Sequence, residues 1–499
     1  MTNTIFTDPF LSSKQLGSEL TETEGCSLAI SFSSILKVGV GYDGKPCGCN
    51  FVYQNDLEIH SRLDICFETL TPPVLEGSQF HRTLTGDKEV DNRKYKQRVG
   101  SIHEGHRIVA PYAPHVRISL YNDPMQDVIA KFVEMCKVVG IADSKILIFR
   151  GQWQLDAVKK GFFKDKRLHI LHKKFATFPF PIAFQLESLL HNSLLHTEDL
   201  EELEPRIGIL RKTHAKRGEL YVAELLRRYN EALQVRKPWE SPMSCFDEAA
   251  KKFEYAGPGS AFRCCHVTFT PTRMLLEGPY ATQSNRVIRR YPGYEDHFIR
   301  VDFRDEDRLQ YRWDRAVDGT SFVRSRVGET LKDGFELAGR QFVFLAYSSS
   351  ALREHAVWFM NPFDHPVEGW INGESIRSSL GDFEGTPLLK CPSKYAARLA
   401  QAFTATDNSV DIRKDEWEMM DDLVCPAPND DYMFTDGVGT ISRSLADRIW
   451  KVLQEAKHNP ANLIQPSAVS LPFLHYYYRY SGFFSVSNQI LGIQRCCRD

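Results

Sequence analysis

Several features are missing from this sequence, and each absence excludes a class of protein. No apolar run is long enough to cross a bilayer, and the opening MTNTIFTDPFLSSKQLG has neither the basic start nor the apolar stretch of a signal peptide. The net charge of −2, from 62 basic and 64 acidic residues, excludes a globally basic nucleic-acid binder but leaves room for a local basic groove. We therefore expect an intracellular protein, nuclear or cytoplasmic, that does not contact a membrane.

Metal and nucleophile motifs are also missing. None of the 12 cysteines forms a CxxC pair, and Cys47-Gly48-Cys49 is too tight for a zinc knuckle, so we expect free thiols and no disulfides. No GxxxxGK[ST], GxSxG, HExxH or protein-kinase set occurs. The densest acidic stretch, DDYMFTD (430–436), reads as a strand, which would send alternate side chains to opposite faces. The sequence thus predicts neither a catalytic residue nor a metal ligand.

The composition indicates a folded protein of several domains. Of its 499 residues, 42% are hydrophobic and 25% charged, and that length exceeds one ordinary core. The fold class expected is α+β. Changes in pattern predict four regions: a β-rich 1–120, a helical domain at 121–236, a linker KPWESPMS at 237–244, and a strand-rich 245–499.

Three stretches of the second region carry helical periodicity: DPMQDVIAKFVEMCKVVG, FPIAFQLESLLHNSLL and RGELYVAELLRRYNEAL. In the third, the predicted apolar side consists of Leu220, Val222, Leu225, Leu226 and Leu233. Beyond the linker, NRVIRRYPGYEDHFIRVDFRDED predicts strand, turn and strand. Gln341 to Tyr347 predicts an apolar strand, followed after a polar turn by a buried aromatic pair.

Arginine is concentrated between residues 286 and 326, where no lysine occurs. Guanidinium groups bind phosphate bidentately and stack on bases, and here they alternate with tyrosine, phenylalanine and tryptophan. This composition is typical of a groove that follows a nucleic-acid strand. The same window also holds eight acids, so internal ion pairs are the alternative interpretation. We predict RNA contacts at Arg286, Arg289, Arg290, Arg300, Arg340 and Arg353.

The stretch FTDGVGTISRSLADRIW (434–450) has two glycines beside an acid but fits neither a Walker A nor a Rossmann pattern. Its local chemistry predicts a turn at Asp436-Gly437, a helix capped by Ser442 or Ser444, and a buried face that includes Leu445 and Ile449. The residues assigned to this structural turn are Asp436, Gly437, Gly439 and Ser442.

Four stretches together resemble the eukaryotic cellular RNA-dependent RNA polymerases of RNA silencing. They are FPIAFQLESLLHNSLL (178–195), NRVIRRYPGYEDHFIRVDFRDED (285–307), GRQFVFLAYSSSALREHAVWFMNP (339–362) and FTDGVGTIS (434–442). The resemblance implies a helical and mixed N-terminal part followed by β-rich linker regions and two double-psi β-barrels, with TDGVGTIS in the first barrel. It also implies nucleotidyltransferase chemistry: RNA synthesis from NTPs on a single-stranded RNA template, giving double-stranded RNA and siRNA, with silencing proteins as partners.

The family's catalytic centre is a DxDGD loop on the second barrel, whose aspartates hold Mg²⁺, and this sequence has no DGD triplet. Arg479 and Gly482 fit the family pattern, whereas Phe483 and Phe484 replace the expected lysine environment. We expect a truncated family member that contains an incomplete first barrel, lacks the Mg²⁺ ligands and is inactive by itself. A non-catalytic RNA-binding module and a helical interaction scaffold are the alternatives.

Overall fold

A computed structural model shows a mixed fold of helices and sheets. It describes residues 6–7, 26–30, 35–43, 62–69, 74–80, 94–99, 108, 110–112, 115–121, 125–142, 146–150, 165–236, 240–255, 257, 261–311, 317–320, 322–348, 356–381, 383, 387–406, 410–413, 416, 438–456, 471–477 and 480–487. The chain divides into two compact units. Unit 1 contains Met1–Tyr280 and Ile299–Phe344, and unit 2 contains Ala281–Phe298 and Leu345–Asp499.

Two sheets come from the N-terminal part of unit 1. One has the order β7-β4-β3-β8, in which β8 is parallel to β3 and the other pairs are antiparallel. Its strands are β3 (Ile35–Asp43), β4 (Arg62–Thr69), β7 (His115–Tyr121) and β8 (Ile146–Arg150). The other has the order β1-β2-β5-β6-β12. Its strands are β1 (Phe6–Thr7), β2 (Cys26–Ala29), β5 (Val74–Phe80), β6 (Lys94–Val99) and β12 (Val317–Asp318). Helix α2 (Met125–Val138) precedes β8.

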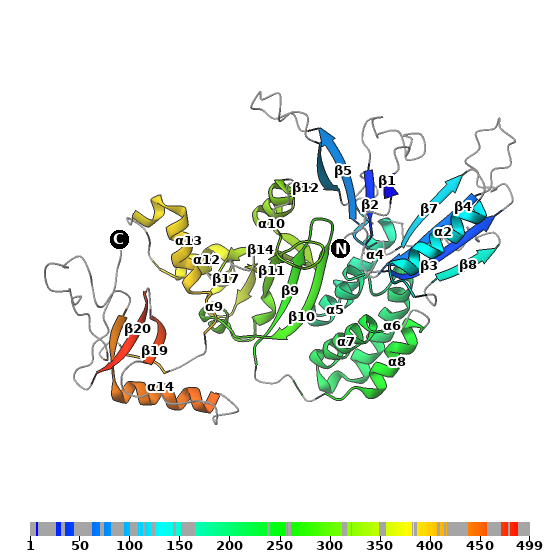
Figure 1. Ribbon diagram of the computed structural model, residues 1–499. Coiled ribbons are helices and arrows are strands. Elements are labelled where there is room, and N and C mark those ends of the chain that lie inside the picture. Colours follow the sequence, from blue (N-terminus) through cyan, green and yellow to red (C-terminus); the bar gives the residue numbers. More distant parts are fainter. Residues whose placement is uncertain are drawn as a thin grey trace. The chain divides into compact units, whose positions relative to one another are not determined.

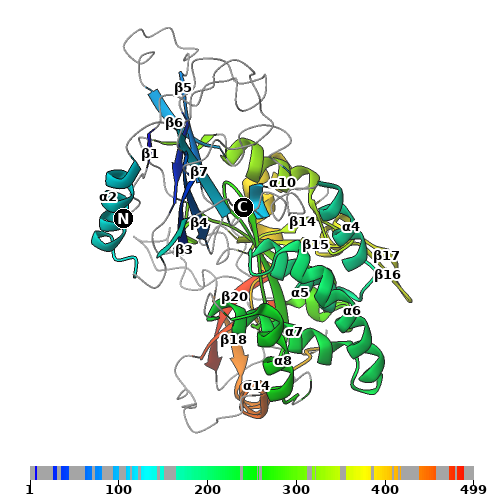
Figure 2. The same cartoon turned by 90° about the vertical axis from the view of Figure 1, so that its right-hand side faces the viewer.

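Unit 1 contains a helical bundle (Figure 1, Figure 2), and a hydrophobic core lies between its helices. Its helices are α4 (Asp165–Phe175), α5 (Phe180–His191), α6 (Thr197–Thr213), α7 (Glu219–Gln234) and α8 (Pro242–Lys252), with the short turns η2 (Ala110–Tyr112) and η4 (Ala215–Arg217). Helix α5 packs against α4, α6 and α7, and α8 packs against α6 and α7. The core between them is built mainly from leucine and aromatic side chains.

Helix α5 is buried on nearly all sides, which explains why its sequence is apolar around the whole helix. Every side chain from Phe180 to His191 except that of Pro181 is buried. Its polar residues bind strand β10 (Met274–Ala281) rather than water: Gln185 Nε2 donates to the carbonyl of Gly278 at 2.8 Å. Asn192, which ends the helix, donates to the carbonyl of Leu276 at 2.6 Å and accepts from its amide at 3.0 Å. These bonds fix β10 on the helix.

The remaining strands of unit 1 follow the bundle. Strand β9 (Arg263–Phe269) lies between β10 and β11 (Phe298–Phe303), and β11 is parallel to β9. Strand β13 (Phe335–Leu337) pairs antiparallel with β14 (Arg340–Ala346). The π-helical segment η6 (Phe322–Val327) runs into α10 (Gly328–Asp333). Gly334 ends that helix with φ +76°, and an added Cβ would lie 2.1 Å from the Phe342 carbonyl oxygen, so only glycine fits there.

Unit 2 combines short strands with four helices among its described residues. Its elements are α9 (Arg286–Arg289), η5 (Glu295–His297), β15 (Ala356–Met360), β16 (Phe363–His365), β17 (Gly369–Ile371), α12 (Gly373–Ser379), η7 (Pro387–Lys390), α13 (Pro392–Gln401), β18 (Val438–Ser442), α14 (Arg443–Ala456), β19 (Leu471–Tyr477) and β20 (Tyr480–Ser487). Strands β16 and β17 form an antiparallel hairpin. Strand β18 is parallel to β20, which pairs antiparallel with β19, and α14 packs against β18 and β20.

Several predicted elements are confirmed. The three periodic stretches form α2, α5 and α7, and the apolar strand at 341–347 is β14, followed by the buried pair Trp358 and Phe359 on β15. The cap on α14 is Ser442, whose Oγ accepts from the Leu445 amide at 3.2 Å, and Leu445 and Ile449 are buried as expected.

Two local predictions are wrong. Leu220 is 48% exposed, because the neighbouring Tyr221 takes the core-facing position on the first turn of α7. The start of NRVIRRY is a short helix instead of a strand, because the side chain of Asn285 caps it. In addition, β8 lies within the range assigned to the helical domain, and α8 begins at Pro242, inside the range assigned to the linker.

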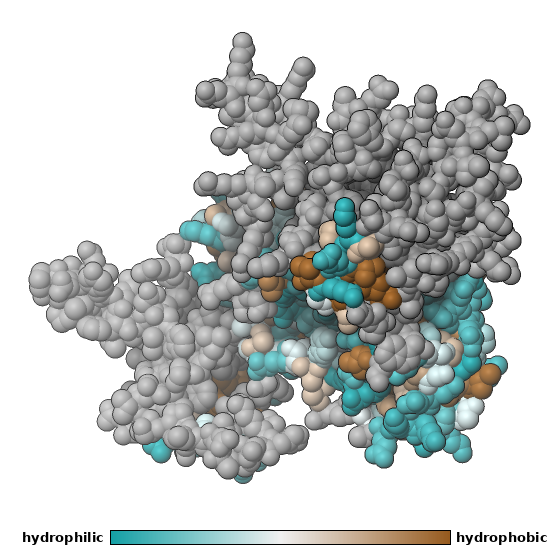
Figure 3. Space-filling model, turned by 45° about the vertical axis from the view of Figure 1, so that its right-hand side comes forward, coloured by the Kyte–Doolittle hydropathy of each residue, from teal (hydrophilic) through white to brown (hydrophobic). Residues whose placement is uncertain are grey.

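The described surface on the face drawn in Figure 3 is mostly hydrophilic, with several small and separate hydrophobic patches. Among the described helices, none is both long and apolar enough to span a membrane.

Candidate nucleic-acid interface

The arginine-rich segment begins at α9 in unit 2. The Asn285 side chain, 1% exposed, accepts from the Ile288 amide at 3.0 Å and so starts the helix. Val287 and Ile288 are buried beneath it. Since neighbouring residues of a helix point in different directions, the burial of these two leaves Arg286 and Arg289 half-buried at its sides.

Two predicted RNA-binding arginines already bind other parts of unit 2. Arg289 donates from its guanidinium to the carbonyl of Thr406 and, at 2.9 Å, to the Thr406 hydroxyl. Arg290 forms an ion pair with Glu368 at 2.9 Å and donates to the Ser379 hydroxyl at 3.0 Å. The Arg290 side chain remains 46% exposed, so its guanidinium is still open to a phosphate. Arg289 therefore has a structural role, whereas Arg290 has both a partner and an accessible face.

Aromatic rings lie directly after these arginines. The ring of Tyr294 stacks on that of Phe363, with centroids 4.5 Å apart and an interplanar angle of 21°. Tyr291 meets Phe363 edge-on at 5.4 Å, and its ring lies 5.6 Å below the guanidinium carbon of Arg290. Phe363 belongs to β16, so the β16–β17 hairpin and the arginine segment share one aromatic core.

In unit 1, the arginine segment continues around a buried carboxylate. Asp302, whose side chain is 5% exposed, lies 3.7 Å from Arg300 Nε, 3.6 Å from an Arg304 guanidinium nitrogen and 3.7 Å from His266 Nδ1. The Asp302 carboxylate thus offsets part of the positive charge of Arg300 and Arg304, as the ion-pair interpretation of the segment expects.

The other predicted RNA-binding and turn residues are dispersed. The guanidinium carbon of Arg340 lies 4.3 Å from the centre of the Phe180 ring, a cation–π contact between β14 and α5. Arg353, Asp436 and Gly437 lie outside the described residues. Gly439 and Ser442 belong to strand β18.

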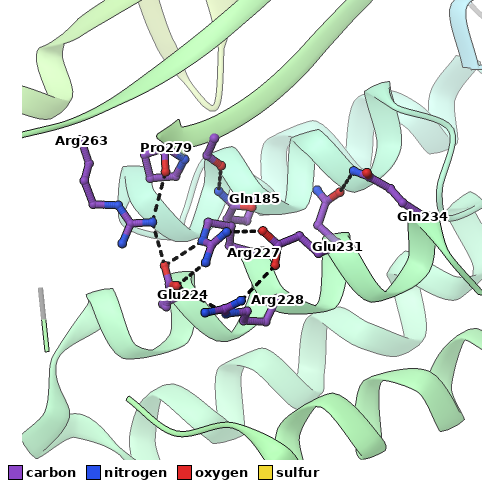
Figure 4. A network of polar contacts seen from close by, with 10 residues as sticks. Gln185, Glu224, Arg227, Arg228, Glu231, Gln234, Arg263 and Pro279 are labelled. Atoms are coloured by element: carbon purple, nitrogen blue, oxygen red, sulfur yellow. Dashed lines mark hydrogen bonds and ion pairs between the residues drawn. The ribbon is translucent and has the colours of Figure 1, made fainter. Parts of the chain in front are cut away.

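A second charged network joins α7 to the β9–β10 pair (Figure 4). Arg227 on α7 donates to Glu224 and Glu231 of the same helix. Arg263 on β9 pairs with Glu224 at 3.1 Å and donates to the Pro279 carbonyl at 3.1 Å (Figure 4). Burial by itself would raise the pKa of Glu224, but hydrogen bonds and charge from Arg227, then Arg263, lower it. This network fixes α7 to strands β9 and β10, and its arginines Arg227 and Arg263 are already paired with carboxylates.

Sequence reasoning missed a buried acid on α5. Glu187, whose side chain is 3% exposed, accepts from His172 Nδ1 at 2.8 Å and lies 3.5 Å from His191 Nε2. Burial by itself would raise the pKa of Glu187, but hydrogen bonds from the two histidines outweigh it and hold the pKa at about 2. The only available sequence signal was an acid at the centre of an otherwise apolar helix.

The pKa values of the two histidines shift in opposite directions. Burial by itself would lower the pKa of His172, but its hydrogen bond to Glu187 and the charges of Glu187 and Glu336 raise it. Burial dominates at His191 and lowers its pKa. The Tyr112 ring completes the group, 5.0 Å from the His191 ring, and burial raises the pKa of its hydroxyl. The arrangement is a buried carboxylate bound to His172, with His191 Nε2 3.5 Å away.

Metal ligands are not gathered in the part of the chain that the structure describes. No set of three His, Cys, Asp or Glu side chains there is placed to hold an ion, and the acidic stretch at 430–436 lies outside it. Five cysteines are free thiols: Cys136, Cys245, Cys264, Cys265 and Cys391. The described residues therefore do not fit Mg²⁺, and we assign them no metal-dependent step.

Comparison with known proteins shows similarity to one family. The family model described as RNA dependent RNA polymerase matches residues 269–469, which include the arginine segment, the β16–β17 hairpin and the β18–α14 stretch. This part of the chain is therefore similar to the RNA dependent RNA polymerase family. RNA-dependent RNA polymerase 1 of Arabidopsis thaliana is 36% identical over 188 residues, covering 37% of this chain and 16% of that protein. RNA-dependent RNA polymerase 6 of the same plant is 33% identical over 235 residues, covering 44% of this chain and 18% of that protein.

One further relative and one solved structure also match part of the chain. RNA-dependent RNA polymerase 1 of Schizosaccharomyces pombe is 28% identical over 277 residues, covering 54% of this chain and 20% of that protein. The solved RNA dependent RNA polymerase QDE-1 from Thielavia terrestris matches with a TM-score of 0.31 and 17% identity, covering 50% of this chain and 26% of that one. The chain spans about a quarter or less of the curated relatives it matches. The family is that of RNA-directed RNA polymerases, which are nucleotidyltransferases.

Proposed function

We propose that this chain supplies an RNA-holding part of a polymerase that copies single-stranded RNA from NTPs in RNA silencing. The observation that supports this is the coincidence of the family match over 269–469 with a segment in which arginines alternate with aromatic rings. On the same resemblance, the β18–α14–β20 stretch belongs to a first double-psi barrel, and the protein works inside the cell with silencing proteins.

Arg290 is the best phosphate contact among the predicted residues. Its side chain is 46% exposed and its guanidinium is bound to Glu368, whose side chain is 33% exposed. An exposed ion pair of this kind contributes little to stability, so its loss should not unfold unit 2. An incoming phosphate would replace the carboxylate as the guanidinium's partner, since both are anions that accept two parallel hydrogen bonds. Arg290 would then hold the RNA backbone without reading its sequence.

A matched pair of variants tests this assignment. Arg290→Gln should weaken single-stranded RNA binding roughly three- to tenfold and should lower the slope of log K against log salt by about 1. Glu368→Gln breaks the same ion pair but should strengthen binding, because the arginine is freed and a negative charge is removed. Fluorescence anisotropy of a labelled oligonucleotide at several salt concentrations measures both.

A purely structural role for the Arg290–Glu368 pair predicts the opposite effect of Glu368→Gln. If the Arg290–Glu368 pair only positions the hairpin, both substitutions remove it equally and should change RNA binding in the same direction. Equal weakening by Glu368→Gln would therefore refute phosphate binding by Arg290. Thermal unfolding of the two variants controls for loss of structure.

Catalysis by these 499 residues alone is not expected, because the sequence contains no DGD triplet and hence no DxDGD loop. The family generally uses divalent metal ions. Incubation of the polypeptide with a single-stranded template, labelled NTPs and Mg²⁺ should give no template-dependent product. A labelled product that depends on the template would show that carboxylates elsewhere in this sequence support synthesis.

A further inference from the structure

The β16–β17 hairpin of unit 2 has one buried and one exposed face. Phe363 pairs with Ile371 in register, and the two side chains are 4% and 3% exposed. The next pair is Asp364 and Trp370, and because successive strand residues point to opposite faces, these two point outward. Trp370 is 58% exposed, an unusual state for the largest aromatic side chain.

The buried face ties this hairpin to the arginine segment. Phe363 stacks on Tyr294, and the ring of His365 lies 5.8 Å from that of Tyr291. The turn of the hairpin carries Glu368, the ion-pair partner of Arg290, two residues before Trp370. Trp370 and the Arg290 guanidinium are therefore fixed on one small substructure and are both open to solvent.

We propose that Trp370 is a stacking platform for a base of single-stranded RNA whose backbone is held at Arg290. This inference rests on the proposed function and adds a second residue to it. A strand bound through one phosphate still has mobile bases, and the exposed ring of Trp370, on the hairpin that carries the Arg290 partner Glu368, can bind any of the four bases through its π-surface. Tryptophan and arginine thus supply the two kinds of contact that such strands require.

The charges around Trp370 favour a base over the other occupants. Its cross-strand partner Asp364 is exposed and negative, and Glu368 follows on the turn, so a phosphate directly over the ring would be repelled. An uncharged base suffers no such repulsion. A protein partner would need a contiguous apolar surface, but Val367, 86% exposed, is the one other exposed large apolar residue described in this hairpin.

Binding of labelled single-stranded oligonucleotides by the full chain tests the platform. Trp370→Ala should weaken binding of an oligouridine by roughly 5- to 100-fold, and Trp370→Phe should restore most of it, because a smaller ring still stacks. Val367→Ala is the matched control, an exposed apolar residue on the same hairpin, and should have no effect. The salt slope should stay unchanged in Trp370→Ala, in contrast to Arg290→Gln, because stacking releases no counterions.

An abasic oligonucleotide of the same length separates stacking from other causes. Wild type and Trp370→Ala should bind it equally, since it keeps the phosphates and lacks the bases. Equal affinity of the two proteins for oligouridine, or an equal loss on both ligands, would overturn the platform. If Arg290→Gln weakens binding while Trp370→Ala does not, this inference fails and the proposed function survives. If wild type binds neither ligand at low salt, both fail.

Discussion

Replacing Glu187 by glutamine should lower the free energy of unfolding at neutral pH by about 1.5 to 3 kcal/mol, the usual loss when a hydrogen bond to a charged group is removed. The carboxylate is 3% exposed and lies between two histidines on α4 and α5, inside the helical bundle. Glutamine keeps the size of the side chain but removes the carboxylate that raises the pKa of His172, so the ring gives up its proton and a neutral contact replaces the charged one. Chemical denaturation of the two proteins measures the difference.

A matched control separates burial from pairing. Glu201 on α6 accepts two hydrogen bonds from Arg167, at 2.7 and 2.6 Å, but its side chain is 39% exposed. Glu201→Gln therefore breaks a pair of equal or better geometry in contact with water and should cost less than about 1 kcal/mol. Equal losses in the two variants would mean that the buried group contributes no more than a surface pair.

The effect of Glu187 should depend on pH with a defined sign. Its folded pKa of about 2 lies below its ordinary value of 4.5, so its contribution is present above pH 4.5 and is lost as the pH falls toward 2. The gap between wild type and Glu187→Gln should shrink over that window. His172 has a raised pKa, so its contribution is complete below its ordinary value of 6.5 and is lost as the pH rises through the raised value.

Helices could be predicted from the sequence where one face repeats at helical spacing. That pattern located α2, α5 and α7, and it located α14 because a serine precedes the apolar face. It failed at Asn285, where one hydrogen bond from a capping side chain outweighs the strand-like alternation of NRVIRRY. It also failed at Leu220, because periodicity alone does not tell which of two adjacent apolar residues a tertiary contact selects.

The candidate site was predictable in composition but not in geometry. The predicted segment of arginines beside aromatics lies within the residues that the family model matches. Their partners come from far away in the chain: Arg289 binds Thr406, and Arg290 binds Glu368. Such contacts depend on the fold of unit 2, so sequence patterns cannot distinguish Arg289, which binds Thr406, from the more exposed Arg290. Trp370 carried no signal at all, because exposure is a tertiary property.

Arg273 leads to the second large expected effect. It is the largest fully buried side chain in the described part of the chain, and its Nε lies 3.4 Å from Oε2 of Glu306. Burial lowers the pKa of Arg273, yet an arginine in a protein stays charged and cannot escape by losing its proton. Glu306 is also fixed, because its Oε1 accepts from the Thr272 amide at 2.8 Å and hydroxyl at 2.7 Å. The β9–β10 turn is therefore closed around one charge pair.

Glu306→Gln should cost about 3 to 5 kcal/mol, because the glutamine keeps an oxygen for Thr272 but leaves the Arg273 charge uncompensated. The double variant Arg273→Met with Glu306→Gln should recover part of that loss, since no buried charge remains and methionine refills most of the volume. Glu277→Gln is the control: it breaks the exposed Arg308–Glu277 pair at 3.3 Å and should cost less than about 1 kcal/mol. Denaturant unfolding of wild type and the three variants shows whether the loss comes from the uncompensated Arg273 charge or from lost packing. A double variant less stable than Glu306→Gln would mean that Arg273 stabilises the turn mainly by packing, and that its charge is incidental.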